Sequence, residues 1–190
     1  TRDIVAMLAA TAAAFAPAAA RAYEVAPMIV ELEPSGPAAR GAMDVRNTGD
    51  QPIAVAVSLL DRSTSEPVDP ETVSIFPFQA TIGPLETQRF RIEWFGARDL
   101  SRSKSWYVQV EQLPIGLGEG AESTAMAFVV NFLAELHVTP PGTAPGIRIE
   151  RWSADGLVIA NDGDRYGYAA DQDLRAPSGA VARADAVLEA

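Results

Sequence analysis

Apolar and polar residues alternate along most of this chain in short runs that are separated by turn-forming residues. A period of two places successive side chains on opposite faces of a strand, and is typical of a half-buried β-strand. Seven such runs lie at 25–33, 41–46, 53–60, 73–78, 88–94, 106–113 and 125–138. Beyond residue 22 no long stretch has a helical period, so the pattern predicts an all-β protein.

Turn signals separate these runs at short intervals, as in an immunoglobulin-like β-sandwich. At Asn47–Asp50 the sequence is Asn-Thr-Gly-Asp, and we expect its Asn and Gly to supply the left-handed backbone of a tight turn. A similar Asn-Asp-Gly-Asp motif occurs at Asn161–Asp164. Pro77 lies inside the run 73–78 and predicts an edge or kinked strand there. Together these signals predict a seven-stranded sandwich over residues 23–139.

The chain after residue 139 has a different character. Its prolines at 140, 141 and 145 cannot continue a sheet, so residues 140–145 are interpreted as a linker. Further strands are expected at 146–152 and 156–160, and a third begins near 166–169. The 45 residues from 146 to 190 are too few for a second sandwich. We therefore expect a second, incomplete immunoglobulin-like β domain, loosely attached, in a truncated product or fragment, with residues 171–190 poorly ordered or extended.

Residues 1–22 have the pattern of a secretory signal peptide. The stretch from Ile4 to Ala20 is apolar and uncharged, and Ala20-Arg21-Ala22 resembles a signal-peptidase cleavage site. A membrane anchor is the alternative, but the stretch is short for a span and contains Pro17. These features predict export to the periplasm, with a mature chain that starts at Tyr23 and is not inserted in a membrane.

Composition narrows the function classes. The formal net charge is −10, which argues against nucleic acid as a partner. The chain has no cysteine, which excludes disulfides, thiol nucleophiles and cysteine-based zinc sites. Its single histidine, His137, lies in an apolar run, and a strand residue near a domain junction is a simpler interpretation than a catalytic one.

Acidic residues are scattered, with no paired carboxylates at a convincing spacing, no metal-ligand cluster and no glycine-rich phosphate loop. Glu31, Glu33, Asp44 and Glu111 are interpreted as solvent-facing strand residues. The sequence therefore predicts a protein that is not an enzyme and needs no cofactor or metal.

Four groups of segments follow one another along the chain in a characteristic order. They are Pro27–Leu32 leading to Asp44–Gly49, then Ile75–Pro84 with Gln88–Ile92, then Ser103–Ile115, and finally Met126–Val138 closed by Pro140. Together these segments resemble the PapD-like family of periplasmic pilus and fimbrial assembly chaperones. The resemblance covers about residues 23–165 and depends on order and spacing more than on any single motif.

This resemblance implies two immunoglobulin-like domains and a role in folding pilus subunits and delivering them to an outer-membrane usher. A subunit that lacks its last strand is completed by a strand lent by the chaperone, and the run 125–138 would be that strand. Its side chains Met126, Phe128, Val130 and Phe132 share one face and are predicted to bind the subunit. The alternative is a central strand that is buried on both sides within this protein.

The residues by which the family anchors the subunit's terminal carboxylate are not basic here. The resemblance implies an Arg on the first strand, where this chain has Ile29 or Glu31, and a Lys on the long strand, where it has Glu135. A carboxylate beside Glu135 would be repelled. The resemblance also implies a charged pair between the two domains, and this pair is absent here because its positions match Lys104 and Thr139. Substitute cations for the anchor are Arg46, Arg89 and Arg91, each of which can also be a solvated strand residue.

Two other classes of function remain open. A secreted immunoglobulin-like adhesin or pilus subunit would need a free N-terminal extension to donate, whereas the apolar alternating strand here is internal. A hydrolase or sugar-binding β-sandwich would need a constellation of polar residues that the sequence does not show.

Overall fold

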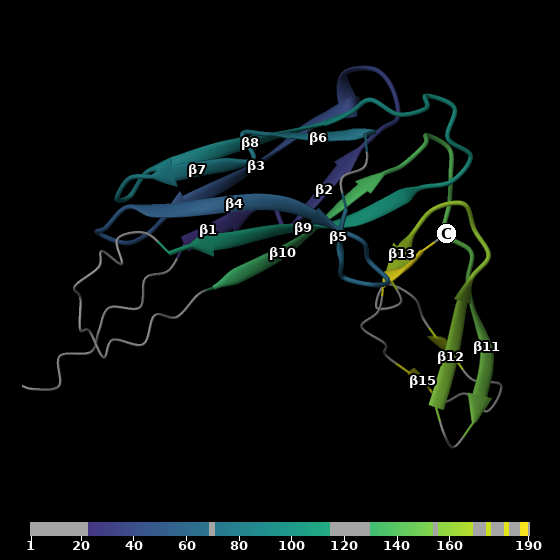
Figure 1. The fold of residues 1–190 in the computed structure, drawn as a ribbon. Helices are drawn as coiled ribbons and strands as arrows, with labels where there is room; N and C mark the ends of the chain where they lie inside the picture. Colours follow the sequence, from purple (N-terminus) through teal and green to yellow (C-terminus); the bar gives the residue numbers. More distant parts are fainter. Residues whose placement is uncertain are drawn as a thin grey trace, which may run out of the picture.

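Two β-sheets packed face to face form the body of the molecule (Figure 1). The structure, a computed structural model, describes residues 23–68, 71–114, 130–153, 156–168, 174–175, 181–182 and 187–189. The proposed signal peptide, residues 1–22, lies outside these ranges. Among the described residues no helix has the length and apolar character needed to cross a membrane.

Sheet A contains four strands and sheet B six. The order in sheet A is β1 (Tyr23–Ala26), β3 (Arg40–Asn47), β8 (Thr87–Trp94) and β6 (Val73–Phe76). Sheet B has the order β2 (Ile29–Leu32), β10 (Asn131–Val138), β9 (Lys104–Leu113), β4 (Ile53–Leu60) and β5 (Pro67–Val68), with β7 (Gln79–Ile82) also paired to β4. A 3-10 turn, η2 (Pro37–Ala39), precedes β3. Within the two sheets the pairs are antiparallel except β2–β10, which is parallel. The all-β, immunoglobulin-like fold class predicted from the alternation is confirmed.

The core lies between the two sheets and is formed by the alternate side chains of each strand that face inward. The largest side chains with almost no exposed surface are Phe90, Leu32, Met43, Ile82, Ile92 and Leu136. They come from both sheets and from strands far apart in sequence, so burial of these groups, at roughly 25 cal/mol per Å² of apolar surface, holds the sandwich closed.

The chain passes from sheet A to sheet B near two prolines. The predicted strand 25–33 is divided at Pro27 into β1 in sheet A and β2 in sheet B. The predicted strand 73–78 is β6 in sheet A up to Phe76, and β7 in sheet B, which was not predicted, follows Pro77. Proline has no N–H for a ladder and cannot continue a central strand. The edge position expected from Pro77 is confirmed, since β6 is the last strand of sheet A. The division at Pro27 was not expected.

Asn47 organises its turn through its side chain, and our expectation of a left-handed backbone there was wrong. Neither Asn47 nor Gly49 has a positive φ. The fully buried Asn47 amide instead donates to the carbonyls of Gln51 (2.7 Å), Gly83 (3.0 Å) and Ile82 (3.2 Å), and its Oδ1 accepts from Gly49 N–H at 2.9 Å.

Asn161 repeats this arrangement in the second part of the chain. Its Nδ2 donates to the carbonyl of Arg165 at 2.8 Å, and its Oδ1 accepts from the N–H of Gly163 at 3.0 Å. The same Asn-x-Gly spacing therefore makes the same local bonds in both turns, because an Asn side chain can mimic a backbone turn.

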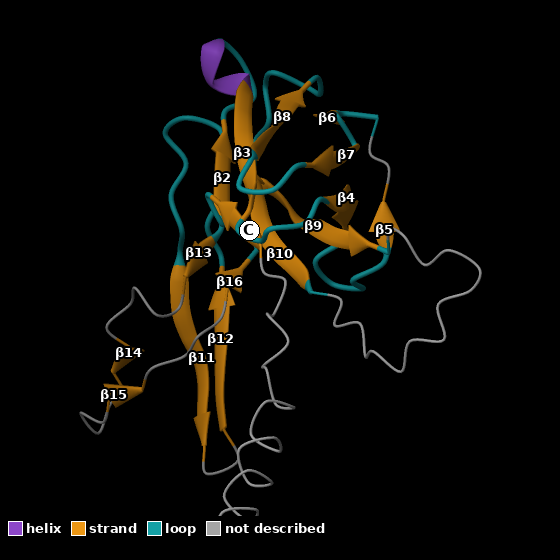
Figure 2. Cartoon of the chain, turned by 90° about the vertical axis from the view of Figure 1, so that its left-hand side faces the viewer, coloured by secondary structure: helices purple, strands orange, loops and turns teal. Residues whose placement is uncertain are grey.

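The second part contains a hairpin and four short strand segments. Strands β11 (Ile147–Ser153) and β12 (Gly156–Asn161) lie where the pattern predicted strands. They pair antiparallel, and the hairpin projects away from the sandwich (Figure 2). Two-residue pairs follow: β13 (Gly167–Tyr168) with β16 (Val187–Leu188), and β14 (Leu174–Arg175) with β15 (Val181–Ala182). The described residues between 171 and 190 lie mostly in these short extended strands, and an extended chain was one of the two alternatives expected for this stretch.

Replacing Asn47 with Ala should destabilise the sandwich by about 2 kcal/mol, because three carbonyls and one N–H lose a buried partner. The free energy of unfolding from urea titration measures this. Asp50→Ala, an exposed change in the same turn, is the control and should stay within about 0.5 kcal/mol of the parent. Equal stability of the two variants would contradict the role given to Asn47.

Candidate strand-binding edge and the polar cluster beside it

Strand β10 is paired along its whole length on one side and along half of it on the other. Strand β9 pairs with it from Asn131 to Val138, whereas β2 pairs with it only from Glu135 to Val138. The N–H of Glu135 donates to the carbonyl of Met28 at 2.8 Å. None of the described strands pairs with β10 over Asn131–Ala134 on this side, and we call this stretch the free edge.

The free edge presents backbone groups that can bind another strand. Along a strand the N–H and C=O groups of successive residues point to alternate sides. The N–H of Glu135 points toward β2, so the N–H groups of Leu133 and Asn131 point to the same side, beyond the end of β2. Such a row of unpaired groups is a template for strand addition.

Exposed apolar side chains surround this edge. They are Val130 (37% exposed), Met28 (41%), Ile29 (44%) and Leu133 (48%). Ile29 is the register partner of Glu135, and Leu133 lies two residues before Glu135 on the outward face of β10. The edge therefore combines main-chain hydrogen-bonding capacity with apolar surface that a partner could cover.

The predicted subunit-binding face is only partly within the described residues. Met126 and Phe128 lie outside them, so their exposure is untested, and the face of four remains a prediction. Val130 is exposed, but Phe132 points toward the chain's own core and packs edge-on against Tyr23, with ring centroids 4.9 Å apart. Leu133 on the opposite face was not singled out, because the run is apolar on both faces and the sequence does not show which one is covered.

The three arginines considered as carboxylate anchors lie on the outer face of sheet A. Arg89 forms a two-pronged pair with Asp44, with both N–O distances 2.7 Å. Arg46 lies 3.7 Å from Glu24. Arg91 is on the same strand as Arg89 and is exposed. Strand β10 belongs to sheet B, so the structure does not bring these arginines to the free edge.

The other half of β10 is covered by a polar cluster that joins it to the second part of the chain. We call Arg62, Glu135, His137, Tyr166 and Tyr168 the corner cluster. His137 is completely buried; its Nδ1 lies 2.8 Å from Ser105 Oγ and its Nε2 lies 3.1 Å from Glu135. The Tyr166 ring stacks on the imidazole at 3.6 Å with an interplanar angle of 6°. His137 is thus a structural junction residue, as the simpler interpretation held.

Glu135 is the hub of the cluster. The Tyr168 hydroxyl donates to it at 2.7 Å, and an Arg62 nitrogen lies 3.5 Å from it. Burial raises the pKa of Glu135, but the hydrogen bonds from Tyr168 and His137 and the charge of Arg62 outweigh burial and lower the pKa overall. The carboxylate therefore stays ionised, and the charge of Arg62 balances it within the protein.

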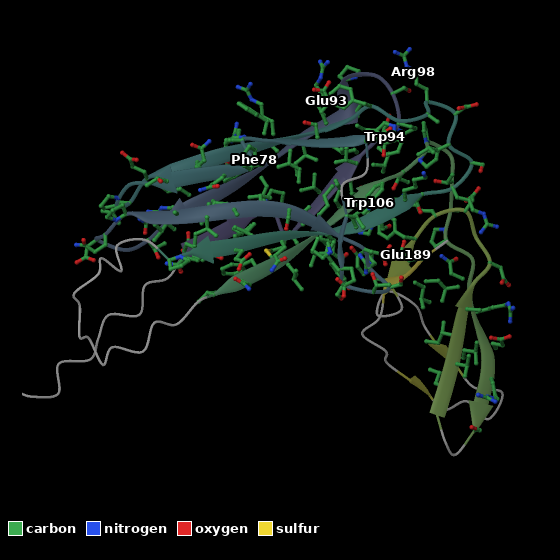
Figure 3. All side chains as sticks on the ribbon, in the orientation of Figure 1. Phe78, Glu93, Trp94, Arg98, Trp106 and Glu189 are labelled. Atoms are coloured by element: carbon green, nitrogen blue, oxygen red, sulfur yellow. The ribbon has the colours of Figure 1, made fainter. Side chains whose placement is uncertain are left out.

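Arg62 connects three elements and was not found from sequence. It lies in the loop after β4, stacks over the Tyr107 ring at 4.5 Å and pairs with Glu189 at 2.8 Å. In Figure 3 Glu189 lies where the second part meets the sandwich. Asp61 fixes the loop by accepting hydrogen bonds from the backbone N–H groups of Ser63 and Thr64. The hydrogen bond from the Ser63 hydroxyl and these two backbone bonds lower the pKa of Asp61 to about 2. A single arginine in a polar loop gives no sequence signal for these long-range contacts.

Further contacts attach the second part more firmly than we expected. The Ser103 N–H donates to the Asp164 carbonyl at 2.9 Å, and the Tyr166 N–H donates to Ser103 Oγ at 2.8 Å. The Tyr166 hydroxyl bonds to Glu31, which also pairs with Arg165 at 3.3 Å. Glu31 and Glu135 thus both serve as internal acceptors at this junction.

Comparison with known proteins gives matches of structure only. No family model matches the chain, and no curated protein matches it in sequence. The Escherichia coli chaperone DraB has a TM-score of 0.60 at 17% identity, covering 78% of this chain and 73% of DraB. The SafB chaperone, solved with the SafA pilin of Salmonella enterica, matches with a TM-score of 0.64 at 15% identity, covering 80% and 73%.

A third match is the complex of CsuC with the tip subunit CsuE from archaic Csu pili of Acinetobacter baumannii, with a TM-score of 0.61, 13% identity and coverage of 88% and 89%. The matched proteins are chaperones, and this chain has their fold. At these identities the likeness establishes the fold alone.

Stability should fall as the pH drops through about 6.5, the ordinary pKa of histidine. Burial lowers the pKa of His137 in the folded protein, against the opposing effect of Glu135. The unfolded chain therefore binds a proton in this range that the folded chain does not, which favours unfolding. The groups around the imidazole are Ser105, Glu135, Arg62, Tyr166, Tyr168 and Glu189.

Urea titrations at several pH values between about 5.5 and 8 measure this effect. His137→Gln keeps a polar side chain and should remove most of the dependence in this range. The lowered pKa of Glu135 gives a separate loss below its ordinary value of 4.5. A parent stability that does not change between pH 8 and 5.5 would contradict the assignment.

Replacing Arg62 with Met should loosen the second part, because Glu135 and Glu189 lose their shared counter-ion while the apolar stem is retained. We expect a loss of about 2 kcal/mol, less than for a fully buried pair, and faster proteolysis beyond Pro140. Arg46→Met, an exposed change, is the matched control and should leave both readouts unchanged. Equal proteolysis of the two variants would show that Arg62 does not hold the junction.

Proposed function

We propose that this protein is a periplasmic chaperone that binds a pilus or fimbrial subunit by strand addition at the free edge of β10. The observation that carries the proposal is that β2 pairs with only half of β10, which leaves Asn131–Ala134 open beside exposed apolar side chains. The fold likeness supports it, since SafB and CsuC were solved in complexes with a pilin and a tip subunit.

The chemistry of the edge fits such a partner. An immunoglobulin-like subunit without its last strand has an open groove and unpaired backbone groups, so a strand from the chaperone can complete its sheet. Each new hydrogen bond contributes about 1 kcal/mol net, and covered apolar surface adds to this. We propose that Met126, Phe128 and Val130, which lead into β10, fill the groove, and that delivery to an outer-membrane usher follows.

We propose that capture relies on strand pairing and apolar contact more than on a carboxylate anchor. Arg89 and Arg46 are paired with Asp44 and Glu24 on sheet A. Beside β10, the Arg62 charge is already shared by Glu135 and Glu189. A subunit's terminal carboxylate would have to displace one of these acids, which makes the junction a poor anion site.

Site-specific photo-crosslinking in the periplasm tests the proposal. A photoreactive amino acid at Leu133 lies beside the free edge, and one at Ala42, on sheet A, is the matched control. We expect position 133 to crosslink at a 1:1 ratio to a small β-rich subunit, identified by mass spectrometry as an immunoglobulin-like chain without its last strand. Crosslinking to such a subunit only from position 42, or from neither, would overturn the proposed function.

Replacing Leu133 with Glu should reduce capture at least tenfold, because a charge would be buried against the incoming strand without a partner. Folding should be retained, since this side chain is 48% exposed in the free protein. Pull-down of the crosslink-identified subunit, with urea titration of the variant, measures both effects. Gln88→Glu, an exchange on sheet A, is the control. Undiminished capture by Leu133→Glu would place the interface elsewhere.

A further inference from the structure

We propose that Tyr23 is a positioning residue that fixes the start of the free edge for the partner strand, an inference that rests on the proposed function. Tyr23 is the first residue of β1 in sheet A and is 3% exposed. Its hydroxyl reaches across the sandwich to two main-chain carbonyls of the other layer, that of Val130 at 2.6 Å and that of Val110 at 2.9 Å.

These two carbonyls define the position where β10 begins. Val130 is the residue before β10, and Val110 is the register partner of Phe132 on β9. The Tyr23 ring also packs edge-on against Phe132. One side chain of sheet A therefore holds the chain just before the free edge, next to the predicted groove-filling segment that ends at Val130.

The hydroxyl is the informative group, because the core does not require it. Phe would fill the same space without the cost of burying a polar group. Burial, with a contribution from Glu111, raises the pKa of Tyr23 to about 12, so the group remains a proton donor throughout the physiological range. The hydroxyl has one proton, which the two carbonyls share in a bifurcated hydrogen bond. This bond restricts the direction in which the main chain enters β10. A strand held in one direction loses less entropy when a partner strand pairs with it.

Tyr23→Phe tests this inference, with Tyr168→Phe as the matched removal of a hydroxyl from the corner cluster. The first readout needs no partner: amide hydrogen exchange in the free protein. Phe132 N–H points toward β9, and its exchange should be roughly fivefold to tenfold faster in Tyr23→Phe, as for the loss of one buried hydrogen bond. Exchange at Leu136, farther along the same strand, should not change. Faster exchange at both positions and across sheet A would indicate a general structural role and overturn the inference.

The second readout is photo-crosslinking from Leu133 with the same variants. We expect the yield to fall several-fold in Tyr23→Phe and to stay unchanged in Tyr168→Phe. Equal yields from parent and Tyr23→Phe, with the parent capturing a subunit, would overturn this inference and leave the proposed function standing. Absence of capture by the parent would overturn the proposed function, and this inference with it.

Discussion

The structure depends on how the main-chain groups of β10 are paired. Buried and half-buried strands must satisfy both of their edges, and β10 has β9 along one edge over its full length. On the other edge the available segment is the four-residue β2, which begins only after the chain has crossed between sheets near Pro27. Its parallel register fixes it against Glu135–Val138. One strand therefore completes the core at one end and remains open to addition at the other.

The corner cluster is the counterpart of the free edge. It covers the outward face of β10 where β2 completes the sheet, and it uses that face to attach the second part of the chain. His137 and Glu135 take their partners from β9, from the loop after β4 and from β13. This region is acidic where the family resemblance implied basic residues. The structure explains the acids, because Glu31 and Glu135 accept hydrogen bonds from tyrosine hydroxyls and pair with arginines of the same protein. Stability of the junction and recognition by the edge are thus properties of two halves of one strand.

The strands could be predicted from sequence because alternation is a local property that burial of one face imposes. Pro77 identified an edge strand for the same local reason. Asn47 was correctly placed in a turn, but its role as a buried hydrogen-bond hub depends on residues 82 and 83, which a local pattern does not include. The site was less predictable. Leu133 and Phe132 are both apolar, and the sequence does not show which of their two faces is covered. The contact of Arg62 with Glu135 and that of Tyr23 with Val130 link residues more than 70 positions apart.

Hydrogen exchange at the amides of Asn131 and Leu133 tests the central claim most directly. These groups point away from β9 and have no strand partner among the described residues, so they should exchange rapidly in the free protein. In a purified 1:1 complex with a subunit that lacks its last strand, the account predicts strong protection of both amides, with little change along β6 at the opposite side of the sandwich. Continued rapid exchange at Asn131 and Leu133, together with new protection along β6, would show that the partner binds another edge and would contradict the account.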